Sequence, residues 1–152
     1  MDNQQNSDVF FMNDAIREAE KSFNTNMGEV PVGAVIVSGG TIIARAHNLV
    51  EQLNDPTAHA EMQAITSATN YIGGKYLRDC TLYVTLEPCP MCAAACYWAQ
   101  IGEVVYGAED PKRGFTTLNS RILHPKTKLR HGILIDQCEK MMKEFFSKLR
   151  KN

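Results

Sequence analysis

Segments of strand type and of helix type alternate along the chain, and this alternation restricts the possible folds more than any other feature of the sequence. The runs VPVGAVIV at 30–37 and TIIARAH at 41–47 flank a Ser-Gly-Gly turn and predict a β-hairpin. TLYVTL at 81–86 and EVVYGA at 103–108 predict two more strands, and a weaker strand is expected at 128–133. Strands that alternate with helices predict a three-layer α/β/α fold around a mixed sheet of about five strands.

Helical periodicity and capping signals account for the segments between these strands. They predict helices over residues 9–23, 57–69, 91–100 and 135–151. Thr57 is placed to cap the second helix, and Pro90 suits the first turn of the third. Residues 1–8 are polar and are expected to form a loose tail. No repeat or low-complexity linker interrupts the chain, so we expect a single domain over residues 1–152.

The cysteines bear on both the compartment and the chemistry. Five cysteines in 152 residues without an export signal do not suggest a disulfide framework, because the cytoplasm keeps thiols reduced. No apolar run reaches the roughly 18 residues that span a bilayer. We therefore expect a cytoplasmic globular protein without membrane segments, whose cysteines bind metal or are buried.

Three side chains that bind metals stand at two predicted helix starts. His59 belongs to a His-Ala-Glu string, and Cys89 and Cys92 belong to Pro-Cys-Pro-Met-Cys. The chain has one Cys-x-x-Cys and no His-x-x-x-His, so a closed site with four protein ligands is not expected. Three ligands leave one coordination position for water, and zinc lowers the pKa of such a water to about 7. We therefore predict one catalytic Zn²⁺ per chain.

Glu61 follows His59 by two residues and is expected to move protons. A carboxylate is a hard ligand that is better used beside the metal-bound water, where it can take a proton and deliver it to the substrate. Free backbone amides at the two helix starts favour the thiolate forms of Cys89 and Cys92.

Simpler explanations exist for each motif taken singly. The cysteine pair could be buried or redox-active, and the histidine could cap a helix beside a surface glutamate. The combination of the two motifs is the signature of zinc deaminases of nucleobases. We assign Cys80, Cys96 and Cys138 to packing, since a fourth ligand such as Cys96 would close the open position.

Longer strings extend this pattern over nearly the whole chain. They are GEVPVGAVIV at 28–37, ARAHN at 44–48, DPTAHAE at 55–61, TLYVTLEPCPMC at 81–92, VVYGAEDPKRG at 104–114 and the ending GILIDQC with EFFSKLRK. In these strings the chain resembles the cytidine deaminase superfamily, and more closely its bacterial tRNA adenosine deaminases of the TadA type.

The resemblance implies hydrolytic conversion of adenosine to inosine at the wobble position of a tRNA anticodon loop, in a homodimer. It implies the same three zinc ligands and the same proton shuttle. By position, Asn48 matches a residue that hydrogen-bonds the base, although an asparagine there could also serve only to end a strand in a turn. The backbone of Ala60, beside the metal, is expected to be a further donor to the base.

Two departures from the family pattern leave the substrate open. HPKTKLRH at 124–131 is shorter than the usual segment and lacks its Asn-His-Arg string, and Tyr97-Trp98-Ala99 resembles the guanine deaminase branch. One alternative is therefore a guanine or cytosine deaminase that acts on small molecules. A second is a zinc-stabilised RNA-binding module without chemistry, with Cys96 as the fourth ligand.

The charges are unevenly distributed and favour RNA as the partner. Residues 1–110 contain 5 Lys and Arg against 14 Asp and Glu, whereas residues 111–152 contain 11 against 3. A free base needs no cationic surface, whereas RNA presents phosphates that Lys and Arg neutralise. Nine residues are expected to contribute to such a surface: Lys112, Arg113, Arg121, Lys126, Lys128, Arg130, Lys148, Arg150 and Lys151. A solubilising fringe around the last helix is the alternative.

Overall fold

The computed structural model describes residues 2–118 and 121–151 and contains one mixed five-stranded sheet. The strands are β1 (Gly33–Ser38), β2 (Thr41–His47), β3 (Cys80–Leu86), β4 (Glu103–Ala108) and β5 (Lys128–His131). They lie in the order β2-β1-β3-β4-β5. β1 is antiparallel to both of its neighbours, whereas β3, β4 and β5 are parallel. The carboxyl ends of the three parallel strands therefore meet at one edge of the sheet.

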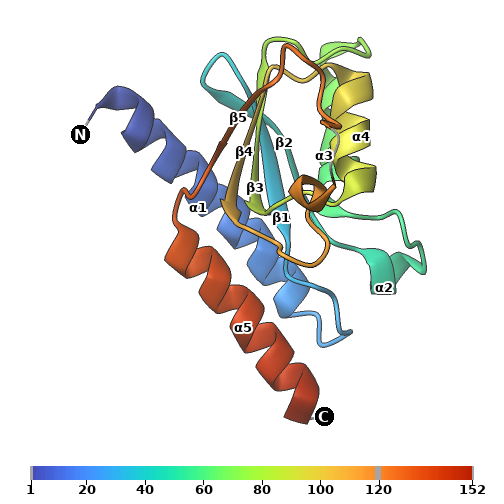
Figure 1. Cartoon of the computed structure of the whole chain (residues 1–152). Helices are drawn as coiled ribbons and strands as arrows, with labels where there is room; N and C mark the ends of the chain where they lie inside the picture. Colours follow the sequence, from blue (N-terminus) through green and yellow to red (C-terminus); the bar gives the residue numbers. More distant parts are fainter. Residues whose placement is uncertain (1, 119–120, 152) are drawn as a thin grey trace.

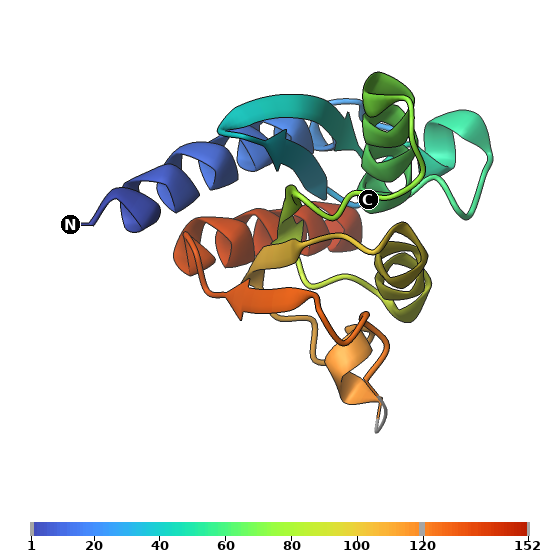
Figure 2. The same ribbon diagram turned by 90° about the horizontal axis from the view of Figure 1, so that it is seen from above.

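Helices cover both faces of this sheet (Figure 1). α1 (Asn3–Phe23) and α5 (Ile135–Lys151) lie on one face, and α3 (Ala60–Ile72) and α4 (Pro90–Ala99) lie on the other. A short helix, α2 (Val50–Leu53), and a 3-10 turn, η1 (Phe115–Thr117), lie in the connections. Seen from above, α1 and α5 are neighbours, and the connection that carries η1 projects near α4 and β5 (Figure 2). The predicted three-layer α/β/α fold is confirmed.

Alternate strand residues supply two apolar cores, one on each face of the sheet. The core toward α1 and α5 includes Met12, Val35, Tyr83, Val105 and Cys138. The core toward α3 and α4 includes Ile36, Ala64, Val84, Ala93 and Val104. Because a slip of one residue would move each strand's side chains to the other face, these cores fix the register and with it the strand ends that carry the site.

The amino-terminal residues are helical, so the expected loose tail over residues 1–8 was wrong. α1 begins at Asn3, and the side chain of Asp2 caps it. Asp8 is buried and forms an ion pair with Arg130, which also pairs with an acid of β4. The polar sequence of residues 1–8 gives no indication that Asp8 pairs with Arg130, which lies 122 positions further along the chain. Residue 1 of that expected tail lies outside the described residues, as do residues 119, 120 and 152.

Two other expectations about the helices need adjustment. Thr57 does not cap a helix, because its N–H and its hydroxyl both donate to Asp55 Oδ1, at 2.8 and 2.7 Å. The N-cap residue of α3 is His59, two residues later than predicted, and α2 was not predicted. In the described ranges, no helix is both long enough and apolar enough to cross a bilayer.

Gly33 lies directly beneath α1, and replacing it by alanine is expected to destabilise the fold. A Cβ at this position would overlap the backbone of Ala15 and Ala19, so α1 would have to move off the sheet. We expect a loss of about 3 kcal/mol in the free energy of unfolding, measured by chemical denaturation. Gly74→Ala is the matched control, because a Cβ there meets no atom within 4 Å, and it should change stability by less than about 1 kcal/mol. Equal stability of the two variants would contradict the close approach of α1.

Candidate metal centre and active site

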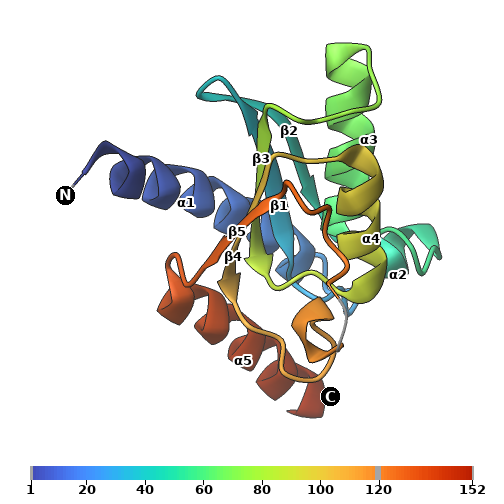
Figure 3. The same cartoon turned by 45° about the horizontal axis from the view of Figure 1, so that its top comes forward.

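The two sequence motifs begin α3 and α4, and the fold brings these helix starts together (Figure 3). His59 is the N-cap residue of α3, with φ −71° and ψ 153°. Cys89 is the N-cap residue of α4, with φ −70° and ψ 168°, and it follows the carboxyl end of β3. Pro90 occupies the first helical position, where its fixed φ is suitable and no amide donor is needed. Extended N-cap backbones direct both side chains into the space between the helices.

The side chains of His59, Cys89 and Cys92 converge on one point. His59 Nδ1 lies 3.6 Å from Cys89 Sγ and 3.5 Å from Cys92 Sγ, and the three atoms all lie within 4.8 Å of one another. A tetrahedral zinc with Zn–N of about 2.05 Å and Zn–S of about 2.3 Å would place nitrogen and sulfur about 3.5 Å apart. The donor set and its spacing therefore fit zinc. In the parts of the chain that the structure describes, no other His, Cys, Asp or Glu side chains form such a group.

The two thiols of the motif differ in acidity. Hydrogen bonds from Cys92 and His59 lower the pKa of Cys89 to about 4. The pKa of Cys92 is raised, because this thiol donates to Cys89 and is buried. The hydrogen bond with Cys89 also raises the pKa of His59. The expected thiolate is thus favoured at Cys89 but not at Cys92, and a divalent cation would supply the charge that two adjacent thiolates require.

Glu61 is buried beside this group, with 3% of its surface exposed. Burial raises its pKa to about 7, and the negative charge of Cys89 acts in the same direction. A carboxyl group with a pKa near 7 can both accept and release a proton at neutral pH. The geometry and the acidity of Glu61 therefore suit a proton carrier next to a metal.

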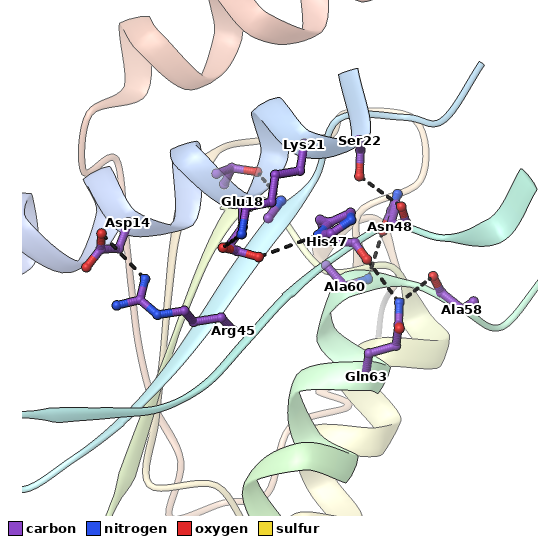
Figure 4. A network of polar contacts seen from close by, with 12 residues as sticks. Asp14, Glu18, Lys21, Ser22, Arg45, His47, Asn48, Ala58, Ala60 and Gln63 are labelled. Atoms are coloured by element: carbon purple, nitrogen blue, oxygen red, sulfur yellow. Dashed lines mark hydrogen bonds and ion pairs between the residues drawn. The ribbon is translucent and has the colours of Figure 1, made fainter. Parts of the chain in front are cut away.

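Asn48 lies at the end of β2 and is 7% exposed. Its Oδ1 accepts a hydrogen bond from the Ala60 N–H at 2.8 Å (Figure 4). This contact fixes the orientation of the amide and leaves the Nδ2 protons as the free donors of Asn48. The Ala60 N–H, which was expected to donate to the base, is instead engaged by Asn48.

The three cysteines that were assigned to packing are buried. Cys80, Cys96 and Cys138 have exposed fractions of 4%, 0% and 2%. Cys96 lies one turn after Cys92 but does not belong to the metal group. The assignment of these cysteines to the core is confirmed.

Comparison with known proteins decides the family. The family described as "Cytidine and deoxycytidylate deaminase zinc-binding region" matches residues 5–108. This chain belongs to that deaminase family. It is 46% identical over 148 residues to the tRNA-specific adenosine deaminase of Aquifex aeolicus, a match that covers 94% of this chain and 96% of that protein. Its identity to the tRNA-specific adenosine deaminase of Bacillus subtilis is 44% over 149 residues, with coverage of 95% and 91%.

Solved structures agree with this assignment. A structure from work on A-to-I editing by tRNA A34 deaminases at the wobble position has a TM-score of 0.78 and 39% identity, and the match covers 87% of this chain and 98% of that chain. The guanine deaminase of Bacillus subtilis has a TM-score of 0.63 and 44% identity, with coverage of 72% and 66%. The resemblance to the deaminase superfamily, and to its tRNA adenosine deaminase branch, is confirmed.

Two of the nine basic residues that were expected to form one surface lie away from the metal group. Arg130 is held by ion pairs with Asp8 and, at 2.9 Å, with Glu103. Lys128 is in register with Glu103 at the amino ends of the parallel strands, whereas Cys89 follows their carboxyl ends. Lys128 and Arg130 therefore do not line the site. Two other residues of the predicted basic surface, Lys112 and Arg113, lie in the loop that follows the carboxyl end of β4.

Glu87, which immediately precedes the Pro-Cys motif, was not predicted as a functional residue. Its buried carboxylate accepts hydrogen bonds from the Asp110 N–H at 3.1 Å and from the N–H and hydroxyl of Thr116, at 2.9 and 2.7 Å. The loop that carries Lys112 and Arg113 is thereby held against the segment that leads to the metal group. The one indication in the sequence was that Glu87, an acidic residue, directly precedes the Pro-Cys motif.

Proposed function

We propose that this deaminase hydrolyses adenosine to inosine at the wobble position of a tRNA anticodon, with one zinc ion per chain held by His59, Cys89 and Cys92. The convergence of these three donors beside a buried carboxyl group carries the proposal. The 46% identity to a tRNA-specific adenosine deaminase over most of both chains supports the substrate. In this proposal the chain forms one deaminase domain.

Glu61 moves the protons of the reaction. A zinc ion held by His59, Cys89 and Cys92 would lower the pKa of a bound water to about 7 and so make it a nucleophile at neutral pH. Glu61 takes one proton from the attacking water and places it on the ring nitrogen next to C6 of adenine as the C6–O bond forms. It then takes the second proton from the added oxygen and delivers it to the amino group as the C6–N bond breaks. Adenosine and water thus give inosine and ammonia. A pKa of about 7 suits a group that must both accept and donate a proton.

Asn48 binds the base through its side-chain amide. Because Oδ1 is engaged by Ala60, Nδ2 is the atom that donates to a nitrogen acceptor of the purine ring. Ala60 therefore contributes to base binding through Asn48, by fixing which end of the amide faces the substrate.

Lys112 and Arg113 bind phosphates of the anticodon loop. Their loop is held beside the metal ligands by Glu87, and both residues are exposed. Replacing both by methionine should raise the KM for an anticodon hairpin several-fold and reduce the slope of log KM against log salt by about 0.7 for each phosphate that is no longer neutralised. Lys128→Met is the control, because Lys128 lies at the opposite end of the strands. A salt slope that falls equally in the control would contradict this placement of the RNA.

The chain forms a homodimer through exposed apolar side chains near the ends of α3 and α4. These side chains are Tyr71, Ile72, Tyr76, Tyr97 and Trp98, and Trp98 is 76% exposed. The rings of Tyr97 and Trp98 pack edge to face with their centroids 5.6 Å apart, and adjoining exposed apolar groups are typical of protein interfaces. The mass in solution, by light scattering, tests this assembly.

Five free cysteines and a tRNA substrate support a cytoplasmic location.

The proposed substrate is tested by incubating the purified protein with a tRNA that has adenosine at the wobble position and, separately, with guanine, cytosine and adenosine. We expect inosine in the tRNA and ammonia in equal amount. Ammonia from free guanine at a rate insensitive to salt would instead support the small-molecule alternative, which the 44% identity to a guanine deaminase and Tyr97-Trp98 favour. Ammonia from none of the four would support the non-catalytic RNA-binding module.

A further inference from the structure

Two short segments carry Asn48 and His59, and hydrogen bonds connect them directly. One segment, residues 47–49, ends β2, and the other, residues 58–60, begins α3. The Leu49 N–H donates to the Ala58 carbonyl at 3.0 Å, and the Ala60 N–H donates to Asn48 Oδ1 at 2.8 Å. The group proposed to bind the base and the proposed metal ligand are therefore parts of one connected structure.

Gln63 completes this connection from the next turn of α3 (Figure 4). Its Nε2 donates to the His47 carbonyl at 2.9 Å and to the Ala58 carbonyl at 3.2 Å. These two carbonyls belong to the peptide groups immediately before Asn48 and His59. The backbone N–H of Gln63 donates to the His59 carbonyl at 3.2 Å, so the side chain extends from a turn that already includes the ligand.

The opposite side of the first segment is held by α1. Ser22 Oγ donates to the Asn48 carbonyl at 2.8 Å, and Glu18 Oε1 lies 3.4 Å from His47 Nδ1 (Figure 4). α1 thus holds the segment against the sheet, but these two contacts do not reach α3. The side chains of Asn48 and Gln63 both join the segment to the turn that carries the metal ligand, and Gln63 is the one that bonds a carbonyl of each segment.

We propose that Gln63 is a positioning residue that sets Asn48 relative to His59, and so sets the base relative to the metal. A carbonyl that accepts a hydrogen bond cannot rotate freely, so the bridge restricts the peptide groups on which both side chains depend. Groups that orient metal ligands typically contribute 10–100-fold to metal affinity or activity. Displacement of a reacting group by about 1 Å can cost 10²-fold in rate. This role rests on the proposed function for Asn48, but its effect on metal binding does not.

Gln63→Met tests the role, because methionine keeps the length and the helix propensity but cannot donate to either carbonyl. We expect zinc affinity, measured by competition with a chromophoric chelator, to fall about 10-fold. For an anticodon hairpin at saturating zinc, we expect a higher KM with a smaller change in kcat, since Asn48 binds the base but does not move protons. Gln63→Glu should behave in the same way, because a carboxylate cannot donate, and Gln63→Lys should restore much of the affinity.

Thr66→Ala is the matched control, because Thr66 is an exposed residue of the same helix whose hydroxyl donates to the Met62 carbonyl one turn back. It should leave zinc affinity and KM unchanged. The proposal is overturned if Gln63→Met and Gln63→Glu both bind zinc and hairpin as the wild type does, or if Thr66→Ala weakens zinc equally. If the wild type deaminates no RNA, the proposed function fails, and the series of zinc affinities still decides the role of Gln63. If Gln63→Met does not fold, Gln63→Glu and Gln63→Lys give the same comparison.

Discussion

Glu61→Gln is expected to lower kcat by about 10³-fold while leaving the zinc content of the protein unchanged. Glutamine has the shape of glutamate but cannot accept a proton from water or carry one to the leaving group. General acid–base catalysis typically contributes 10²–10⁴-fold, and here one carboxyl group serves for each proton transfer. The measurement is kcat on a hairpin with adenosine at the wobble position, together with the zinc content by atomic absorption.

A matched control separates catalysis from charge. Glu51→Gln makes the same chemical change at an exposed position of α2, outside the metal group, and should leave kcat within about two-fold of the wild type. If Glu61→Gln retained full activity, another group would have to move the protons, and the proposed reaction would be wrong. If it lost its zinc as well as its activity, Glu61 would be supporting the metal rather than carrying protons.

Much of the fold followed from local patterns. Local patterns predicted the hairpin of β1 and β2, the strands β3 and β4, and the helix α5. Their apolar periodicity is strong, and turn residues or ligand motifs mark their ends. The start of α1 could not. The buried Asp8 is partnered by Arg130 of β5 and by the Tyr83 hydroxyl of β3, and periodicity within one segment contains no information on partners so far along the chain.

The candidate site divides in the same way. The three metal-binding side chains and Glu61 belong to two short motifs, and few functions other than zinc catalysis need this combination of residues. They could therefore be found without coordinates. Gln63 and Glu87 could not be found in that way, because each acts by hydrogen bonds to backbone groups that only the fold brings near. The basic residues show the opposite case. Their sequence composition suggested one surface, but the register of β5 places Lys128 away from the site.

Replacing Cys92 and Cys96 of α4 by alanine, one at a time, should show whether three or four protein side chains bind the metal. Binding of zinc to a four-ligand site contributes about 10–16 kcal/mol, so one protein ligand is worth about 2.5–4 kcal/mol if the ligands share it equally. Cys92→Ala should therefore weaken zinc binding by about 10²–10³-fold and abolish deamination. Competition with a chelator of known affinity measures the first effect, and ammonia release measures the second.

Cys96→Ala is the matched control and also decides between a catalytic and a structural role of the metal. Cys96 is buried one turn from Cys92 and its thiol has a raised pKa because of burial, so it should remain a neutral packing group. The change should cost about 1 kcal/mol of stability through a small cavity, with zinc affinity unchanged. If Cys96→Ala lost zinc as Cys92→Ala does, four protein ligands would surround the metal. No position would then remain for water, and the chain would be a zinc-stabilised binding module instead of an enzyme.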